Sequence, residues 1–229
     1  MLQVFKSLKW FTILYFFVVV IDVFVKLCLP LTSYRYATKV LLIVLVILFY
    51  HNNKDHNRKK RLFVYTALSF FFMGDILVLN HSNTVVLAVC LLIFFLAKLF
   101  LSFRFSHKHD FKITRLIPFL IVMFLYIIAV FNLIYTRLHE FLLPAILTFF
   151  ISLLLLQFAV LRKGVVNKSS YLCVLFGVLF YILTESMMAI KIFSEPFIYQ
   201  EALIIIFYTF SVYLIHVGIV REKIIKRDY

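Results

Sequence analysis

The sequence predicts an all-α integral membrane protein: a bundle of eight transmembrane helices with both termini in the cytoplasm. Three observations predict this fold class. Hydrophobic residues make up 65% of the chain and the mean hydropathy is +1.06, whereas globular domains are only about half apolar. The apolar residues form long unbroken runs, and the basic residues gather between alternate runs. A water-soluble domain of this length could not bury so much apolar surface.

Eight apolar segments are long enough to cross a bilayer as helices, which requires about 20 apolar residues each. Pro30 closes the first segment, and Pro118 and Pro144 fall in the first turn of the fifth and sixth, where proline is tolerated. We predict one polytopic membrane domain over residues 1–229. The expected spans are residues 8–29, 36–50, 62–79, 84–103, 116–135, 141–161, 171–192 and 202–220, and the short second span is expected to begin near Tyr34.

The packing between these spans is expected to involve large side chains. The chain has 29 Phe and only 4 Gly, a composition that argues against close, glycine-lined helix crossings. The three cysteines, Cys28, Cys90 and Cys173, each lie within an apolar run, so neither a disulfide framework nor a zinc spacing is readable. His107 and His109 lie in a basic connection and are expected to be solvated. We expect no metal and no cofactor.

The distribution of Lys and Arg predicts the orientation. Most of the 24 basic residues lie in alternate connections, beginning with Lys6 and Lys9 before the first span. The positive-inside rule places such connections, and with them both termini, in the cytoplasm. Residues 51–61, HNNKDHNRKKR, are expected to face anionic lipid headgroups and not nucleic acid. We expect the chain in a bacterial cytoplasmic membrane.

Two carboxylates inside the expected spans are the main candidates for chemistry. Asp75 directly follows Gly74 in an apolar stretch, and Glu185 lies in the seventh span. A charge inside a membrane helix costs several kcal/mol and by default marks a functional site. Each lies about 14 residues, or roughly 21 Å, along an outward-running span, so we expect both in the outer third of the bilayer. Alternatively, Asp75 lies near a helix end and reaches interfacial water.

Other charged and polar residues in the spans have competing interpretations. Asp22 and Lys39 are expected near the depth of Asp75, and Lys98 lies closer to the cytoplasm. Asp22 alternatively pairs with Lys26 one turn along its helix, and both Lys39 and Lys98 alternatively extend to a headgroup region. Tyrosines within spans more often pack than react, but we assign Tyr208 to substrate binding.

Several short motifs in the spans occur together in one family. The third span carries a Gly-Asp pair, and Lys39 matches the lysine of a second-span Lys-Pro-Leu region, with Val40 in place of proline. Five stretches in order, covering nearly the whole chain, carry the likeness: TKVLLIVLVI, SFFFMGDILVL, LLIFFLAKLFLSFRF, FGVLFYILTESMMAIKIF and IIIFYTFSVYLIHVG. With them, the chain resembles the YhhN family of lysoplasmalogenases.

At two motif positions the chain departs from this family. The family's Gly-His is Ala97-Lys98 here, and its Ser-Asp is Thr184-Glu185. The second change keeps a carboxylate but moves it out by one methylene. The first replaces a group that titrates near neutrality with one that is normally cationic.

The resemblance implies hydrolysis of the vinyl ether of lysoplasmalogens to a fatty aldehyde and a glycerophospho-base. Such a bond is cleaved by acid through an oxocarbenium ion that water captures, a division of labour like that in glycoside hydrolysis. We therefore expect Asp75 and Glu185 to be catalytic and to face one cavity within about 6 Å of each other. Lys39, Lys98 and Tyr208 are expected to bind the lysophospholipid, with Lys39 at its phosphate.

Two other functions fit the same residues. A non-catalytic lipid-binding or small-solute transport protein would use the same polar pocket, but transporters often show internal repeats and Gly- or Pro-broken helices. The chain has no visible repeat and only 4 Gly, which ranks this alternative second. A structural role ranks third, in which Asp75 and Glu185 pair with Lys39 and Lys98.

Overall fold

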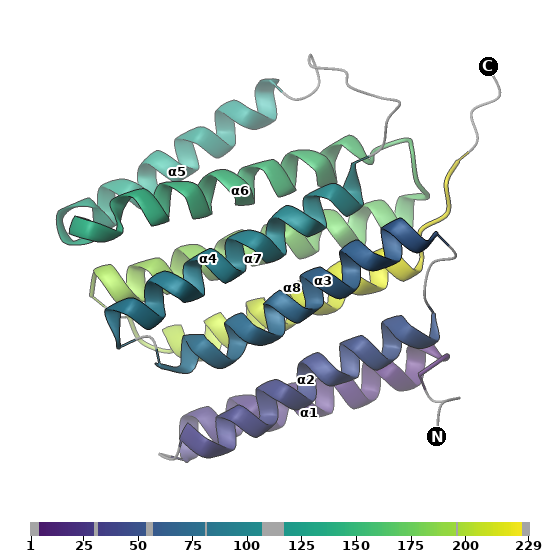
Figure 1. The fold of residues 1–229 in the computed structure, drawn as a ribbon, viewed down its shortest axis with the longest axis horizontal. Helices are drawn as coiled ribbons and strands as arrows, with labels where there is room; N and C mark the ends of the chain where they lie inside the picture. Colours follow the sequence, from purple (N-terminus) through teal and green to yellow (C-terminus); the bar gives the residue numbers. More distant parts are fainter. Residues whose placement is uncertain are drawn as a thin grey trace. The chain divides into compact units, whose positions relative to one another are not determined.

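In the computed structural model, the described part of the chain comprises residues 5–29, 32–53, 57–80, 82–106, 117–195 and 197–225. These residues form eight α-helices and two short 3-10 turns (Figure 1). Pro30, His107 and His109 lie outside the described residues. The helices are α1 (Leu8–Cys28), α2 (Thr32–Asn52), α3 (Arg58–Leu77), α4 (Thr84–Phe105), α5 (Ile117–Leu138), α6 (Leu142–Leu161), α7 (Lys168–Phe193) and α8 (Gln200–Val220).

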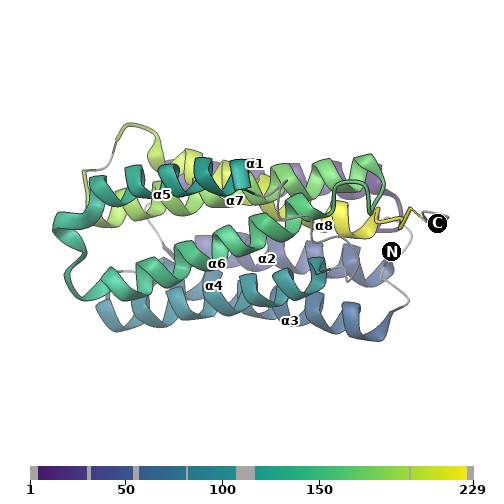
Figure 2. The same ribbon diagram turned by 90° about the horizontal axis from the view of Figure 1, so that it is seen from above.

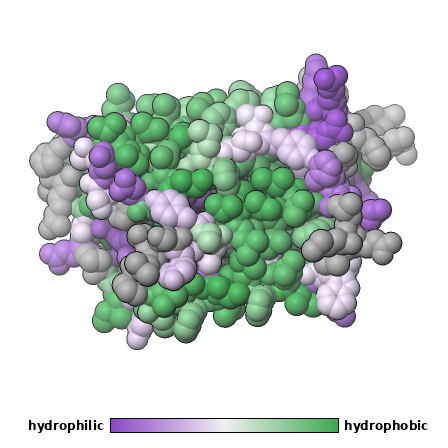
Figure 3. All heavy atoms as spheres, turned by 60° about the horizontal axis from the view of Figure 1, so that its bottom comes forward, coloured by the Kyte–Doolittle hydropathy of each residue, from purple (hydrophilic) through white to green (hydrophobic). Residues whose placement is uncertain are grey.

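The predicted helical membrane fold is confirmed for the described residues. Seven of the helices are long and apolar enough to cross a membrane, and within α5 the apolar stretch Ile121–Ile134 is shorter. The count of eight spans and the cytoplasmic placement of both termini stay predictions. Large apolar side chains are exposed along the helices, as lipid-facing surfaces require; Phe17 in α1 is 63% exposed and Phe124 in α5 is 62% exposed. Figure 3 shows such apolar surface on one face.

Polar residues at the helix starts extend several helices beyond the apolar runs. The side chain of Asn57 accepts hydrogen bonds from the backbone N–H groups of Lys59 and Lys60. This N-cap satisfies donors that have no partner in the first helical turn. As a result, α3 begins at Arg58 and includes a basic turn that the hydropathy pattern assigned to a connection.

The contacts divide the chain into two compact units, Met1–Phe100 and Leu101–Tyr229. Unit 1 contains α1, α2, α3 and most of α4, and unit 2 contains the end of α4 and the remaining helices. The single domain over residues 1–229 stays a prediction.

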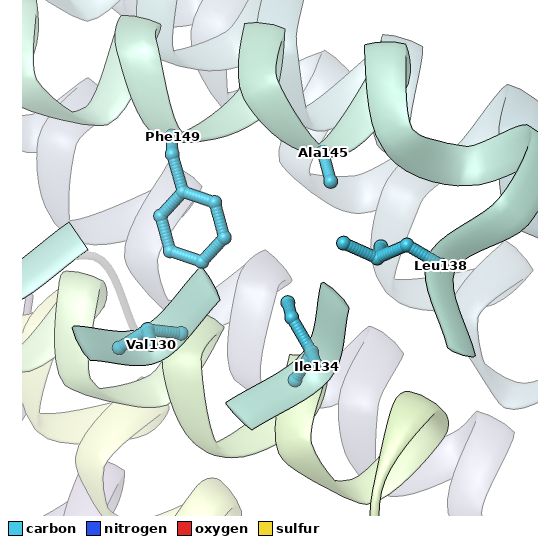
Figure 4. Close-up of a cluster of buried hydrophobic side chains, with 5 residues drawn as sticks. All are labelled: Val130, Ile134, Leu138, Ala145 and Phe149. Carbon is cyan, nitrogen blue, oxygen red and sulfur yellow. The ribbon is translucent and has the colours of Figure 1, made fainter. Parts of the chain in front are cut away.

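In unit 2, an apolar cluster joins α5 to α6. It consists of Val130, Ile134, Leu138, Ala145 and Phe149, all buried, and Figure 4 shows the side chains from the two helices pointing toward one another. Partly buried Ala189, Ile190 and Phe193 of α7 pack against it. This packing positions the part of α7 that follows Glu185.

The tightest helix pair is α7 with α8 (Figures 1 and 2), and it depends on two glycines. A Cβ atom on Gly218 would lie 2.6 Å from Cγ2 and 3.0 Å from the backbone N of Val174. On Gly177 it would lie 2.8 Å from Cγ1 and 2.9 Å from the backbone N of Ile215. The expectation that large side chains, and not close glycine crossings, pack the helices is therefore wrong for this pair. Two of the 4 glycines are placed where the helix backbones approach.

Replacing Gly218 with Ala is expected to destabilise the protein by about 1–3 kcal/mol, because the new methyl group overpacks the interface with Val174. At an unobstructed helical position the same change would stabilise by up to about 1 kcal/mol. A loss of stability would therefore show that the added methyl group is crowded at this interface. Thermal unfolding of the detergent-solubilised variant measures it, and an unchanged or higher Tm would contradict the close approach of α7 and α8.

Candidate functional site

Three helices of unit 1 bring charged and polar side chains together. We call Asp22 of α1, Arg35, Thr38 and Lys39 of α2, and Asp75 of α3 the unit 1 polar cluster. Asp22 is 1% and Asp75 is 3% exposed. The two carboxylates are therefore inside the protein, and the alternative that Asp75 reaches interfacial water at a helix end does not hold.

Within this cluster, Lys39 pairs with Asp75. The Lys39 Nζ atom lies 3.5 Å from Oδ1 of Asp75, and the lysine side chain is 13% exposed. Lys39 and Asp75 were expected at a similar depth, and the two side chains are in contact; the expected binding of a lipid phosphate by Lys39 stays a prediction. This ion pair also fits the structural alternative for Asp75, so function must be tested on activity and stability separately.

Asp22 has a partner on the neighbouring helix. The Thr38 hydroxyl donates a hydrogen bond to Oδ1 of Asp22. Thr38 directly precedes Lys39 and follows Arg35 by three positions, which places these side chains on nearby faces of α2. One stretch of α2 thus meets carboxylates from both α1 and α3.

The Gly-Asp pair of α3 has a steric explanation at the glycine. A Cβ atom on Gly74 would lie 2.8 Å from the ring of Phe94 in α4. The Cys90 thiol, one turn before Phe94, donates to the Gly74 carbonyl at 3.6 Å. Gly74 therefore lets α4 pack directly against the turn that carries Asp75, which fixes the position of this carboxylate.

Lys98 is in the same unit but is fully buried, with 0% exposure. A side chain that extended into a cytoplasmic headgroup region would be exposed, so that alternative is not supported. Its assignment to substrate binding stays a prediction.

In unit 2, a second group of polar side chains surrounds Glu185, which we call the unit 2 polar cluster. The Ser152 hydroxyl of α6 donates to Oε2 of Glu185. The Tyr126 hydroxyl of α5 donates to Oγ of Ser186 at 2.9 Å, and Glu185 also acts electrostatically on Tyr126. Three helices, α5, α6 and α7, thus converge on the predicted carboxylate.

Ser152 and Ser186 were not identified from the sequence, and Tyr126 was interpreted as a packing residue. Serine gives little signal inside an apolar helix, because its hydroxyl can bond to the backbone of the preceding turn. The Ser186 hydroxyl does so, donating to the carbonyl of Ile182 at 3.0 Å. The meeting of α5, α6 and α7 is what gives these residues polar partners on other helices.

The other predicted site residues lie as follows. Tyr208 of α8 makes a tilted ring contact with Tyr181 of α7, at 6.2 Å between centroids, and its role in substrate binding stays a prediction. Asp75 belongs to unit 1 and Glu185 to unit 2; the single cavity expected for them also stays a prediction. Among the described residues, no group of three or more His, Cys, Asp or Glu side chains is arranged to hold a metal ion.

Unit 2 also contains a buried ion network, formed by residues just beyond the ends of three predicted spans. Glu222, just after α8, accepts from Arg104 Nη1 at 3.0 Å and from Arg162 Nη2 at 3.0 Å. Arg104 is 1% and Arg162 is 0% exposed. The Ser170 hydroxyl links Arg162, at 2.7 Å, to the Gly218 carbonyl.

Burial lowers the pKa of Arg162 from its ordinary value to about 10, with Glu222 acting in the opposite direction and Arg104 adding to the decrease. The guanidinium therefore stays protonated at neutral pH.

The segment after α8 is also held by Lys223, the residue that follows Glu222. Lys223 and Asn167 exchange hydrogen bonds of 3.0 and 2.9 Å. The network ties the segment after α8 to the ends of α4 and α6.

These features define the class of the chain. An all-helical chain with seven helices apolar and long enough to cross a bilayer, in the part that is described, is an integral membrane protein. The chain belongs to the YhhN family, whose family model matches residues 34–219. No curated protein and no solved structure gives a significant match.

Proposed function

We propose that this protein hydrolyses the vinyl ether bond of lysoplasmalogen-type lysophospholipids, with Asp75 and Glu185 as the acid–base groups. The observation that carries the proposal is the buried carboxylate of Asp75, which follows Gly74 and pairs with Lys39 in a chain of the YhhN family. A carboxylate at this position is costly in a membrane protein, so its presence supports a chemical role.

The reaction consumes one water and needs no other reactant. A proton adds to the vinyl carbon remote from the ether oxygen, which leaves an oxocarbenium ion at the carbon bonded to oxygen. Water adds to that carbon and gives a hemiacetal, losing a proton to a base. Cleavage of the carbon–oxygen bond to glycerol then releases the aldehyde and the glycerol hydroxyl. The two carboxyl groups thus exchange one proton over the cycle.

The contacts of the carboxylates support a division of roles. An ion pair engages an ionised carboxylate, so the contact of Asp75 with Lys39 suits Asp75 to the anionic role. In that role it stabilises the oxocarbenium ion and accepts the proton of the attacking water. Glu185 is then assigned the role of proton donor; the hydrogen bond from the Ser152 hydroxyl holds the side chain in place and does not itself favour the protonated form. This division parallels the unequal pair of carboxyl groups in glycosidases.

The test is an aldehyde-release assay on purified, detergent-solubilised protein. A 1-alkenyl lysophospholipid is compared with its 1-acyl counterpart, and fatty acid is measured beside aldehyde. We expect aldehyde from the alkenyl lipid and no product from the acyl lipid. A folded sample that releases no aldehyde would reject the proposal and favour a non-catalytic lipid-binding or transport protein.

A further inference from the structure

The start of α2 carries a cation with an unused hydrogen-bond donor. Arg35 lies in the first turn of α2, and its Nε atom is buried without a hydrogen-bond partner. Leaving a buried donor unpaired costs about 1–3 kcal/mol. An acceptor supplied by a ligand would therefore be stabilised at this position.

The surroundings of Arg35 indicate headgroup depth. The candidate membrane span of α2 begins at Tyr34, and the side chains on either side of Arg35, Tyr34 and Tyr36, are 51% and 37% exposed. Tyrosines are enriched where a helix leaves the hydrocarbon region and meets lipid headgroups. Arg35 thus lies at the level where lipid phosphates are found.

The charges near Arg35 are already assigned to other contacts. Asp22 acts electrostatically on Arg35 but also accepts a hydrogen bond from Thr38. Lys39, one turn further along α2, lies 3.5 Å from Asp75. Lys39 was expected to bind the lipid phosphate, yet its Nζ atom already contacts the Asp75 carboxylate, whereas the Nε donor of Arg35 has no hydrogen-bond partner. Arg35 is farther from this carboxylate along α2, by one turn of about 5.4 Å.

We propose that Arg35, together with the first turn of α2, binds the phosphate of a single-chain phospholipid. The inference rests on the proposed function for the class of lipid. A guanidinium binds a phosphate through two parallel N–H groups, and the start of a helix adds N–H donors and a favourable dipole. In a lysophospholipid the phosphate and the vinyl ether are joined by glycerol and lie only a few bonds apart, as Arg35 and Lys39 lie one helical turn apart.

The experiment measures binding, so it does not depend on turnover. The probes are a 1-alkyl lysophospholipid, which has no cleavable vinyl ether, and the matching 1-alkylglycerol, which lacks the phosphate. Both are titrated against the purified full-length protein in detergent. We expect the protein to prefer the phosphate-bearing lipid, and Arg35→Ala to weaken its binding by about 10- to 100-fold without changing alkylglycerol binding.

Two further variants and one competitor sharpen the test. Arg35→Lys keeps the positive charge but lacks the planar guanidinium group, so an intermediate affinity is expected. This variant also provides the test if Arg35→Ala does not fold. Arg58→Ala removes an exposed arginine at the start of α3 and should bind as the wild type does. Glycerophosphocholine, a phosphate ester without a chain, should compete poorly.

Equal affinity of the wild type for the two lipids, or an unchanged preference in both Arg35 variants, would overturn the inference. Equally strong competition by glycerophosphocholine would overturn its assignment to a lipid. Failure of the proposed function looks different: the phosphate-dependent binding would persist while no aldehyde is released from the alkenyl substrate.

Discussion

Replacing Glu222 with Gln is expected to lower the free energy of unfolding by about 3–5 kcal/mol, the cost of removing one partner of a buried ion pair. The single carboxylate of Glu222 lies 3.0 Å from both Arg104 and Arg162. Because these arginines are 1% and 0% exposed, neither can recover its hydration in the folded protein. The variant would leave two buried like charges beside each other. Thermal unfolding followed by size-exclusion chromatography measures the loss.

A matched carboxylate serves as the control. Glu201 pairs with Lys191 at 2.7 Å, but the two side chains are 38% and 21% exposed. Glu201→Gln should therefore cost at most about 1 kcal/mol, as is usual for exposed ion pairs. A melting temperature of Glu222→Gln equal to that of Glu201→Gln would contradict the role of the buried network.

A triple variant distinguishes two causes of this destabilisation: the unpaired buried charges, and the loss of the hydrogen bonds that attach the segment after α8. Arg104→Met, Arg162→Met and Glu222→Leu together replace the ions by apolar groups, which is often neutral or stabilising for buried networks. We expect this variant to recover most of the stability lost in Glu222→Gln. If it does not, the hydrogen bonds that attach the segment after α8 matter more than the charges.

The pKa of Arg162 sets the sign of the pH dependence. Its pKa in the folded protein, about 10, is below the ordinary value of an arginine, so at pH values between the folded and the ordinary pKa the unfolded chain binds more protons. The contribution of Arg162 to the free energy of unfolding therefore rises with pH in that window and is constant below it. Between pH 7 and 9 we expect no loss of stability from this residue.

Replacing Asp75 with Asn is expected to reduce aldehyde release by about 10²–10⁴-fold, the usual contribution of a general acid or base. Asn keeps the shape of the side chain and an oxygen facing Lys39, but it cannot ionise or accept a proton. The fold should be retained. Turnover is measured per folded protein, with Glu201→Gln as the carboxylate control outside the polar clusters.

Comparing two substitutions distinguishes catalysis from a structural ion pair. If Asp75 only neutralises Lys39, then Asp75→Asn and Lys39→Met should lower the melting temperature by similar amounts, and the turnover of the folded fraction should stay near that of the wild type. That result would reject Asp75 as a catalytic residue. Because Asp75→Asn also removes the partner of the buried Lys39, some fall in melting temperature is expected for either role; loss of turnover in the fraction that stays folded is the outcome we expect for a catalytic Asp75.

Much of the fold could be predicted because hydropathy reports the length and position of membrane helices. Every expected span from 8–29 to 202–220 overlaps one of the observed helices over most of its length. Several helices begin earlier than predicted: α3 begins at Arg58 and α7 at Lys168, before the predicted residues 62 and 171. Polar residues in a first helical turn do not add to an apolar run, so hydropathy does not detect them.

The candidate site was predictable only where a residue was unusual by itself. Asp75 stood out because a carboxylate is rare in an apolar segment, and Lys39 was expected at its depth; the two meet in unit 1. Ser152 did not stand out, although its hydroxyl contacts Glu185 from another helix. Arg35 was not identified as a site residue from the sequence.

The sequence by itself determined that this is a helical membrane protein, which of its carboxylates are exceptional, and which family it belongs to. These properties depend on the local run of side chains, because a membrane helix satisfies its backbone hydrogen bonds within one segment. Only the tertiary structure decided that Glu222 neutralises Arg104 and Arg162, and that Gly218 lies against Val174. Such pairs join residues from separate helices, and their cost or benefit arises only when packing removes both partners from water and lipid.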